Sequence, residues 1–463
     1  MRGVRAFSFG KLWVPGGVLL ICISATSVRG QTDPGPRGGP AGAGGPIAGL
    51  SAGETALFNR GKASFLEIDS VSGSEPGAPG SGLGPRFNMN QCAGCHAQPD
   101  VGGSSPSSAS QQNPAPNPQV AIATRYGAIN TVPSFITADG PVREVRFVKK
   151  SSGKADGGVH DLYVITGRSD AGACRIGQED FASAAASGNA IFRIPTPVFG
   201  GGLIAAIPDN SILTNKGLLL SRKSQRGISG HENRSANDGT ITRFGWKAQN
   251  KSLTMFAGEA YNVEQGVTNE VFPNERDETQ GCATNGIPED HTNADATTPT
   301  DMLSDVSAFA LFMQFLDQPA LGPQNASTTH GASLFADVGC SLCHTPNLTT
   351  GASSSPALNF KTAALQSDLL VHHMGSGLAD GITQGSAGPD EFRTAPLWGL
   401  GQRIFFLHDG RTSDLMQAIQ AHASTGSEAN ATVDVFNGVA PAFSGHVLTS
   451  SDQQDLLNYL RSL

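Results

Sequence analysis

The sequence contains few charged residues. Asp, Glu, Lys and Arg make up 15% of its 463 residues, whereas an average soluble domain has about 25%. Lysine and arginine form no cluster, and the 39 acidic residues outnumber the 31 basic ones, which gives a formal net charge of −8. Because proteins hold phosphate backbones with basic patches, we expect no nucleic-acid partner.

The sequence also lacks an apolar run of the roughly 20 residues that cross a bilayer. The longest run near the start, residues 12–23, is interrupted by proline and glycine and follows basic residues without any acid. This pattern is typical of an export signal. We therefore predict a signal peptide over residues 1–30, cleavage before Gln31, and a periplasmic or otherwise exported protein without a stable membrane span.

Glycine and proline are abundant instead, with 58 and 28 residues, so long stretches of the chain are expected to be loops. Residues 31–50 are rich in both and are predicted to be a disordered segment or a surface tether. The total length predicts two or three domains, with ample residues to bury a core.

Four of the six cysteines beyond the predicted signal lie in two copies of one pattern, Cys92-Ala93-Gly94-Cys95-His96 and Cys340-Ser341-Leu342-Cys343-His344. C-x-x-C-H is the attachment signature of c-type haem. The two thiols reach the two vinyl groups of one porphyrin, and the histidine ligates the iron. A zinc site or a pair of disulfides is the alternative, but no further Cys or His stands close by to complete the four ligands of a zinc site. We predict two covalently bound haem c groups, with His96 and His344 as iron ligands.

Cys174 and Cys282 are the remaining cysteines, and both lie in loop-like surroundings. In an oxidising compartment such a couple is expected to form a disulfide. Two unrelated free thiols are the alternative.

Apolar periodicity and capping residues predict the elements around these anchors. Ser51 and Glu54 form a capping box at the start of a helix, whose Leu57, Phe58 and Phe65 would face the first haem. Strands are expected over 142–148 and 162–166, helices over 301–316, 331–338 and 450–463, and an extended, wrapping segment over 191–207.

A short internal repeat follows the two C-x-x-C-H motifs. Phe244-Gly245-Trp246 aligns with Phe406-Leu407-His408, and seven residues beyond each third position stand Leu253 and Leu415, which open helical stretches. Seven residues further on, the first copy has Ala260 where the second copy has His422. If the copies fold alike, this position faces the iron from the distal side.

His422 is therefore expected to be the second protein ligand of the second haem, which it closes together with His344. The first haem, with a methyl group at the matching position, is expected to be open. His372, His373 and Met374 are the rival ligands, and a packing role for His422 is the alternative.

Five stretches of the sequence resemble one known family. On these residues the chain is similar to the di-haem oxidoreductase family, whose members are described as thiol oxidoreductases or peroxidases, within the superfamily of bacterial di-haem cytochrome c peroxidases and MauG. The matching stretches are Gly84-Pro85-Arg86-Phe87-Asn88, residues 192–200 (Phe-Arg-Ile-Pro-Thr-Pro-Val-Phe-Gly), residues 243–248 (Arg-Phe-Gly-Trp-Lys-Ala), residues 393–400 (Arg-Thr-Ala-Pro-Leu-Trp-Gly-Leu) and residues 406–411 (Phe-Leu-His-Asp-Gly-Arg).

The resemblance implies a mainly α fold with two cytochrome c-like helical domains, long loops and a small β-containing insertion in the first half. The first domain, with the insertion, would cover residues 51–317 and the second residues 331–463. The relatives also hold a bridging calcium, which backbone carbonyls bind in part. Such ligands leave no sequence pattern, so calcium is neither predicted nor excluded here.

The resemblance also implies roles for individual residues. His422 stands fourteen residues after His408, where the relatives have Met or Tyr as distal ligand of the electron-accepting haem. An imidazole in place of a thioether should lower the potential of that haem. Trp246 matches the tryptophan that bridges the haems of the relatives, and an ordinary buried tryptophan is the alternative.

Glu264 lies near the position of the distal acid–base glutamate of the peroxidase relatives, two residues early by strict count. Such a group moves protons between the peroxide oxygens. Glu259 is the other candidate, and a solvated carboxylate is the alternative for both. His231 stands where some peroxidases carry a displaceable histidine, against the alternative of a polar loop residue.

These features together predict an exported di-haem c-type oxidoreductase, peroxidase-like, with Trp246 and Glu264 as its functional side chains. Electrons from a small redox protein or another donor would pass from the second haem to the first, where peroxide or an unknown small substrate reacts. A non-catalytic di-haem electron-transfer protein is the alternative. Thiol oxidation rests on the naming of the family alone.

Overall fold

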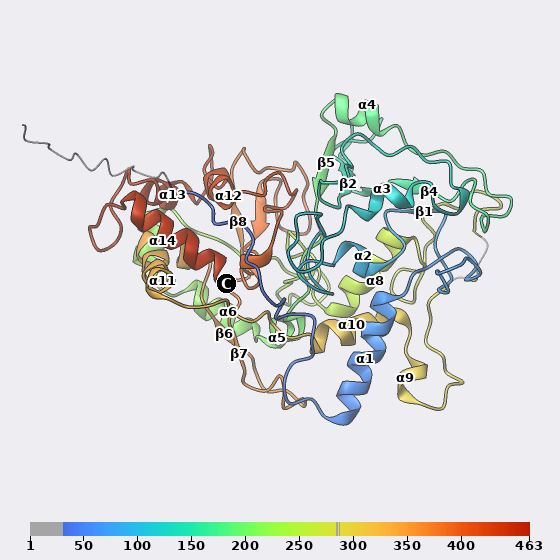
Figure 1. Cartoon of the computed structure of the whole chain (residues 1–463), viewed down its shortest axis with the longest axis horizontal. Helices are drawn as coiled ribbons and strands as arrows, with labels where there is room; N and C mark the ends of the chain where they lie inside the picture. Colours follow the sequence, from blue (N-terminus) through green and yellow to red (C-terminus); the bar gives the residue numbers. More distant parts are fainter. Residues whose placement is uncertain (1–30, 284–285, 287) are drawn as a thin grey trace, which may run out of the picture.

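The structure is a computed structural model that describes residues 31–283, 286 and 288–463. The predicted signal peptide, residues 1–30, lies outside the described residues. Figure 1 shows most elements of residues 51–315 on one side of the molecule and most of those of residues 326–463 on the other. Across the described ranges, no helix is long and apolar enough to cross a membrane.

Three helices form the centre of the first half: α1 (Ala52–Leu66), α8 (Leu253–Gln265) and α10 (Asp305–Phe315). The predicted capping box of α1 is confirmed, because the Ser51 side chain accepts from the backbone N–H of Glu54 and the Glu54 side chain accepts from that of Ser51. Buried aromatic rings of α1 and α10 pack between these helices. They belong to the largest apolar core of the chain.

The last third is built on α11 (Ala326–Val338) and α14 (Ser450–Arg461), which pack against each other. α12 (Leu415–Ala421) and α13 (Asn430–Phe436) lie beside them (Figure 1). α14 begins where predicted, with Thr449 as its cap. α11 begins earlier than predicted, because Asn325 and Thr328 form a capping box between the two expected domains, in the stretch from residue 318 to residue 330.

Small antiparallel sheets occur in both halves, so the mainly helical expectation holds only in part. The largest has three strands in the order β3 (Val159–His160), β2 (Glu144–Phe147) and β5 (Ala190–Arg193). It is the β-containing insertion that the sequence predicts. The two-stranded sheets are β1 (Arg86–Phe87) with β4 (Tyr163–Val164), β6 (Leu348–Thr349) with β7 (Thr362–Ala363), and β8 (Val371–His373) with β9 (Glu391–Arg393).

Short helices connect these elements. Two of them, α6 and α7, come from the first half of the sequence but pack against β6 and α13 of the last third. The expected boundaries at residues 317 and 331 therefore stay a prediction. The short helices are α2 (Cys92–Cys95), α3 (Pro118–Ile122), η1 (Arg125–Gly127), α4 (Phe181–Ala186), α5 (Gly201–Ala206), α6 (Asp209–Lys216), α7 (Leu220–Arg226), α9 (Pro299–Met302), η2 (Cys340–Leu342) and η3 (Leu400–Gln402).

Two predicted elements are wrong in detail. Residues 191–207 are extended only at their start, in β5, and then turn into helix α5. The glycines of this segment allow α5 to pack closely on α10, because a Cβ atom on Gly202 would overlap the carbonyl group of Gln314 in α10. The expected helix over 301–316 is broken into α9 and α10, since the Ser304 side chain caps a new helix start.

Cys174 and Cys282 form a disulfide bond, as expected. Both cysteines are buried in a second apolar core, which the β-containing insertion shares with the segment after α8. The bond therefore joins two loops that lie 108 residues apart in the sequence.

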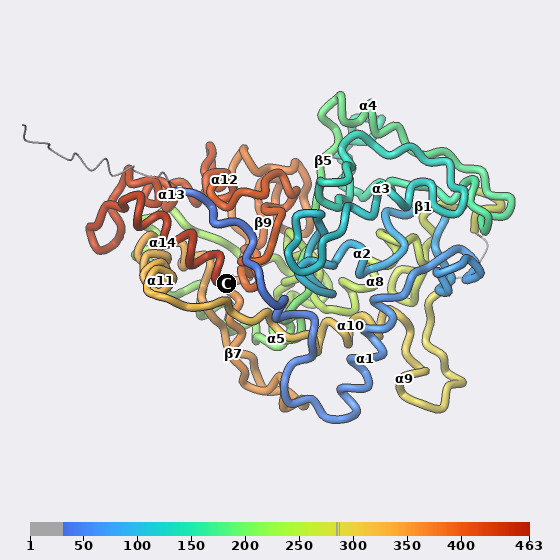
Figure 2. The backbone as a smooth tube through the Cα atoms, viewed as in Figure 1, coloured from blue at the N-terminus to red at the C-terminus, as the bar shows by residue number. Residues whose placement is uncertain are grey.

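Residues 31–50 are not the disordered segment that their composition suggests. They run across the last third of the molecule and on toward α1, as the dark-blue tube in Figure 2 shows. The backbone N–H of Arg37 donates to the carbonyl oxygen of Gly401, and that of Ile47 donates to Phe315. Asp33 forms a buried ion pair with Arg461 at 2.6 Å. These long-range contacts give order to a stretch with almost no apolar side chains.

We expect Asp33→Ala to destabilise the protein by about 3 kcal/mol, because it leaves the buried Arg461 guanidinium without its carboxylate. Burial opposes ionisation of Asp33, but hydrogen bonds and the charge of Arg461 outweigh it and lower the pKa of the carboxyl. The ion pair therefore stabilises the fold fully above the ordinary aspartate pKa, near 4, and is lost as pH falls through the lower folded value.

Urea unfolding of wild type and Asp33→Ala at pH 7 and at pH 3 measures this effect. The difference between the two proteins should shrink at the lower pH. An equal difference at both pH values would contradict the ion pair as its origin.

Candidate functional site

The predicted repeat is present in the structure. In each copy the phenylalanine pairs in an antiparallel bridge with the residue six positions later, Phe244 with Asn250 and Phe406 with Thr412. In each copy a polar side chain then caps the following helix, α8 or α12. Ala260 stands fourteen residues after Trp246, and His422 fourteen residues after His408. Each of the two lines a cavity, and the two cavities are separate.

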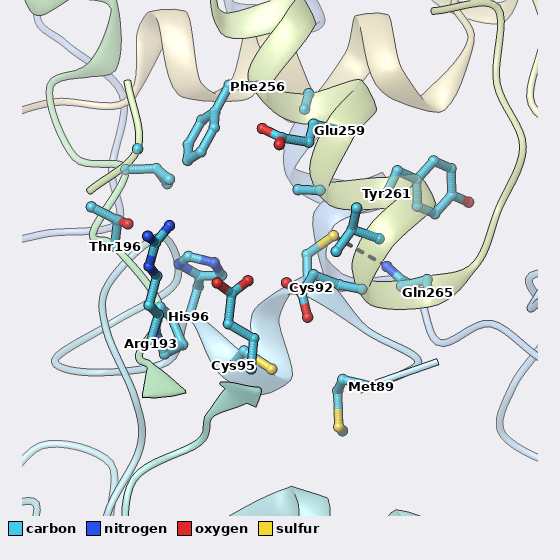
Figure 3. A pocket seen from close by; sticks show the side chains of 18 of the residues that line it. Met89, Cys92, Cys95, His96, Arg193, Thr196, Phe256, Glu259, Tyr261 and Gln265 are labelled. Atoms are coloured by element: carbon cyan, nitrogen blue, oxygen red, sulfur yellow. Dashed lines mark hydrogen bonds between the residues drawn. The ribbon is translucent and has the colours of Figure 1, made fainter. Parts of the chain in front are cut away.

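The first cavity, of about 160 Å³, is mostly apolar and contains the first C-x-x-C-H motif. Figure 3 shows Cys92, Cys95 and His96 at one side of it and Phe256 and Glu259 of α8 at the other. Among the described side chains that line this cavity, His96 is the only histidine. Two thioethers line it as well, those of Met89 and Met313.

His96 is oriented for metal binding through its Nε2 atom. Its Nδ1 atom is bonded to the carbonyl oxygen of Gly103 at 2.9 Å, the outer contact that fixes the tautomer of metal-ligating histidines. Burial lowers the pKa of His96 to about 4, so the imidazole is neutral, as a ligand must be. Of the three α1 side chains expected to face the first haem, Phe65 packs edge-on against His96 at 5.8 Å between centroids, whereas Leu57 and Phe58 do not line the cavity.

Two carboxyl groups in the first cavity are hydrogen-bonded to each other, those of Glu264 and Glu144. Arg146 donates to Glu144 at 2.7 Å. Burial and the neighbouring Glu144 raise the pKa of Glu264 well above its usual range. The second sequence candidate, Glu259, also lines this cavity and accepts from Asn250.

Glu144 and Arg146 are the residues that sequence reasoning missed in this cavity. They stand two apart on strand β2, so both side chains lie on one face of the sheet. The pattern of a charged pair at this spacing inside an otherwise apolar strand is visible in the sequence. Its link to the first cavity is seen only in the fold, which places β2 near the end of α8.

The second cavity, of about 230 Å³, contains the second C-x-x-C-H motif and His422. The Nδ1 atoms of His344 and His422 are bonded to carbonyl oxygens, of Gln366 at 3.0 Å and of Ala418 at 2.7 Å. Both Nε2 atoms are thereby left for a metal. Burial lowers the pKa of His344, to about 4, and that of His422, so both imidazoles are neutral.

The rival ligands differ from His422. Both ring nitrogens of His372 are bonded to carboxylates, Nε2 to Asp368 at 3.0 Å and Nδ1 to Glu428 at 2.8 Å. His372 also lines the second cavity, but neither of its ring nitrogens is free to bind a metal. His373 faces solvent, whereas Met374 lines the cavity.

The second cavity also contains two buried arginines that fit the anionic propionates of a haem. Arg403 has no carboxylate partner among the residues that the structure describes, and Arg393 donates only to the carbonyl oxygens of Gly245 and Thr394. Burial lowers the pKa of each to about 10. Because a buried unpaired cation is costly, this donor set favours an anionic ligand.

Trp246 lines both cavities. Its Nε1–H donates to the carbonyl oxygen of Ile194 at 2.9 Å, and its ring meets that of His408 edge-on at 6.4 Å. His408 in turn stacks on Phe392, which also lines the second cavity. The indole is thus held in the wall between the two candidate haem sites.

His231 lines neither cavity. Its Nε2 atom is bonded to Glu391 at 2.7 Å, and the ring is partly exposed. Within residues 31–283, 286 and 288–463, no three or more His, Cys, Asp or Glu side chains are grouped so that they could hold a metal ion.

Three solved structures are similar to the chain at low identity. Hydrazine synthase from Kuenenia stuttgartiensis is 14% identical, with 98% of this chain and 100% of that chain covered and a TM-score of 0.36. The diheme peroxidase BthA from Burkholderia thailandensis is 16% identical over 48% and 65%, with a TM-score of 0.29. A MauG-like protein associated with microbial copper homeostasis is 15% identical over 36% and 55%, with a TM-score of 0.23. No curated protein matches the chain.

One family model matches the sequence over residues 146–462, and its description is "Di-haem oxidoreductase, putative peroxidase". The match includes four of the five stretches that suggested the resemblance, the second C-x-x-C-H motif and both copies of the repeat. It covers more than half of the sequence. The chain therefore belongs to the di-haem oxidoreductase family.

Proposed function

We propose that the chain is an exported di-haem c-type oxidoreductase that reduces peroxide at a haem held by His96. Electrons from a small redox protein or another donor enter at a second haem, held by His344 and His422. One observation carries this proposal: the repeated distal position is Ala260 in the first cavity and His422 in the second. The two sites are therefore built for different coordination.

The cysteines of each C-x-x-C-H motif would hold the two haems covalently, and the histidines would ligate the irons. When bound, the haems supply one-electron carriers and an iron at which a small substrate reacts. Burial raises the pKa of the Cys92 and Cys95 thiols, in keeping with the apolar surroundings that a porphyrin needs. The apolar lining of both cavities excludes bulk water from the sites.

The side chains around the first site take separate roles in this proposal. Trp246 carries electrons between the two cavities through its π system. Glu264 gives and takes protons at the substrate. In the second site, imidazole ligation by both His344 and His422 lowers the potential relative to a thioether ligand, so a strongly reducing donor is required.

A non-catalytic electron carrier is the second candidate function. It is favoured by the thioethers of Met89 and Met313, which line the first cavity. A thioether is an iron ligand in cytochromes c, and one of these two sulfurs would close the first site. Such a protein would have two six-coordinate irons and no site for peroxide.

Electron paramagnetic resonance of the purified ferric protein, with and without hydrogen peroxide, tests the two functions. The oxidoreductase should give one low-spin signal from the His344 site and one high-spin signal from the His96 site. Peroxide should change the second signal first. Two low-spin ferric signals that peroxide leaves unchanged would refute the enzyme and support the carrier.

A further inference from the structure

We infer that Glu144, on strand β2, forms one proton-sharing pair with Glu264 and thereby makes Glu264 the proton donor of the first cavity. Glu144 acts through Glu264 and is a positioning residue. The inference rests on the proposed reduction of peroxide at this site. It adds to that function the device by which a buried carboxyl group stays protonated where the reaction needs an acid.

The hydrogen bond between the two side chains requires a proton on one of them. Ionised carboxylates only accept hydrogen bonds, so two of them cannot bond to each other. Arg146 decides which group is charged, because it donates to Glu144 at 2.7 Å. Glu144 is consequently the carboxylate, and Glu264 is the carboxylic acid that donates to it.

The charges around the pair favour the same assignment. Arg146 and Arg193 stabilise the negative charge on Glu144 and, although burial opposes this, lower its pKa. Arg193 itself is bonded to Asp380 at 2.6 Å and to Gln384. Arg193 therefore acts on Glu144 through its charge, while its hydrogen bonds go to other residues.

Glu264 has negative rather than positive neighbours. Asp161, which Arg276 holds at 2.9 Å, adds to the repulsion from Glu144, and the Cys95 thiol lies close by. The Asn88 amide lies close to Glu264 and favours its charged form, against these effects. The carboxyl also stands in the last turn of α8, where the helix dipole disfavours a negative charge.

The pair supplies protons in a balanced reaction. Hydrogen peroxide takes up two electrons and two protons and gives two water molecules. The O–O bond breaks and two O–H bonds form, while the external one-electron donor is oxidised twice. Glu264 gives its proton to the oxygen that departs, which makes water rather than hydroxide the leaving group. Solvent returns a proton to the pair before the second transfer.

The test uses the full haem-loaded protein and two readouts. The first is the infrared C=O band of a buried protonated carboxyl, measured in H2O and D2O without substrate. The second is the pH dependence of kcat/KM for hydrogen peroxide. Glu264→Gln should remove its share of this absorption, while that of Asp69, whose pKa burial raises to about 8, stays. The same variant should lower kcat/KM by about 10²- to 10⁴-fold.

Two variants of β2 should move the alkaline limit of kcat/KM in opposite directions. Glu144→Gln removes a negative charge beside Glu264 but keeps a hydrogen-bonding group, so the limit moves to lower pH and the band weakens at neutral pH. Arg146→Gln removes the positive charge, so the limit moves to higher pH. Glu144→Asp should restore the wild-type profile in part. Glu179→Gln, which removes a carboxylate of the same insertion at a pair with His160 outside the cavity, should change neither readout.

Shifts of the same sign in Glu144→Gln and Arg146→Gln, or a C=O absorption that is unchanged in Glu264→Gln, would overturn the inference. Each charge variant has its own expected direction against wild type, so the other still tests the inference if one fails to fold. If Glu264→Gln reduces the absorption in a protein that does not reduce peroxide, the proposed function is refuted and the carboxyl pair is not.

Discussion

His422→Ala is expected to convert the second haem from six-coordinate, low-spin iron to five-coordinate, high-spin iron. The wild-type imidazole lines the second cavity with its Nδ1 atom fixed on Ala418, so Nε2 is the free donor. Alanine has no donor atom, and it reproduces the residue of the first repeat copy. Electron paramagnetic resonance and visible spectra of the ferric protein should show the low-spin signal replaced and the His96 signal unchanged.

A matched control is His373→Ala. This histidine stands on β8 near the same cavity, but it faces solvent and is paired with Asp390. Its removal should leave both signals as in wild type. His422→Met should retain a low-spin iron but raise its potential, because a thioether replaces an imidazole. If His422→Ala leaves both iron centres spectroscopically untouched, His422 is not the ligand.

Gly61→Ala is expected to cost about 3 kcal/mol of unfolding free energy, the upper part of the range for overpacking a dense contact. Gly61 lies in α1 where the helix crosses α10, and a Cβ atom there would overlap the carbonyl oxygen of Ala308 and the Phe312 side chain. The helices must move apart, which also loosens Phe65 against His96. Denaturant unfolding of the haem-loaded protein measures the loss.

Gly53→Ala in the same helix is the control. A Cβ atom at Gly53 would have no neighbour within 4 Å, and alanine is a better helix former than glycine by up to about 1 kcal/mol. This variant should be as stable as wild type or slightly more stable. Equal losses in both variants would show that helix propensity, and not the α1–α10 contact, controls the effect.

The repeat was predictable from the sequence because its two copies share the residues that determine the backbone conformation. Matching phenylalanines, polar caps and helix-opening leucines impose the same bridge and the same helix start on both. Because the backbones match, Ala260 and His422 occupy equivalent positions in the two copies. Their roles toward iron stay predictions, as do those of Trp246 and Glu264.

The partner of Glu264 was not predictable in this way. Glu144 belongs to a strand of the insertion, and nothing local indicates that β2 lies against the end of α8. The same holds for Arg403, which reads as an ordinary polar residue until the fold buries it in the second cavity. Contacts between distant segments depend on the whole fold, and periodicity within one segment does not contain them.

The order of residues 31–50 is not visible in their composition for a related reason. A stretch rich in glycine and proline has little apolar surface to bury, so it is ordinarily disordered. Here its backbone hydrogen bonds and one buried ion pair act in place of an apolar face. Similarly, glycines favour the extended segment predicted over residues 191–207, whereas in the structure Gly201 and Gly202 form the contact surface between two helices.

The pair of Asp33 and Arg461 has a consequence for how the molecule is made. The two residues are 428 positions apart, so a ribosome completes nearly all of the described chain before the arginine exists. Asp33 also accepts from the backbone N–H of Leu415, where the helix that leads to His422 begins. A polypeptide that terminates before residue 461 would therefore lack the ion pair that holds this arm across the molecule.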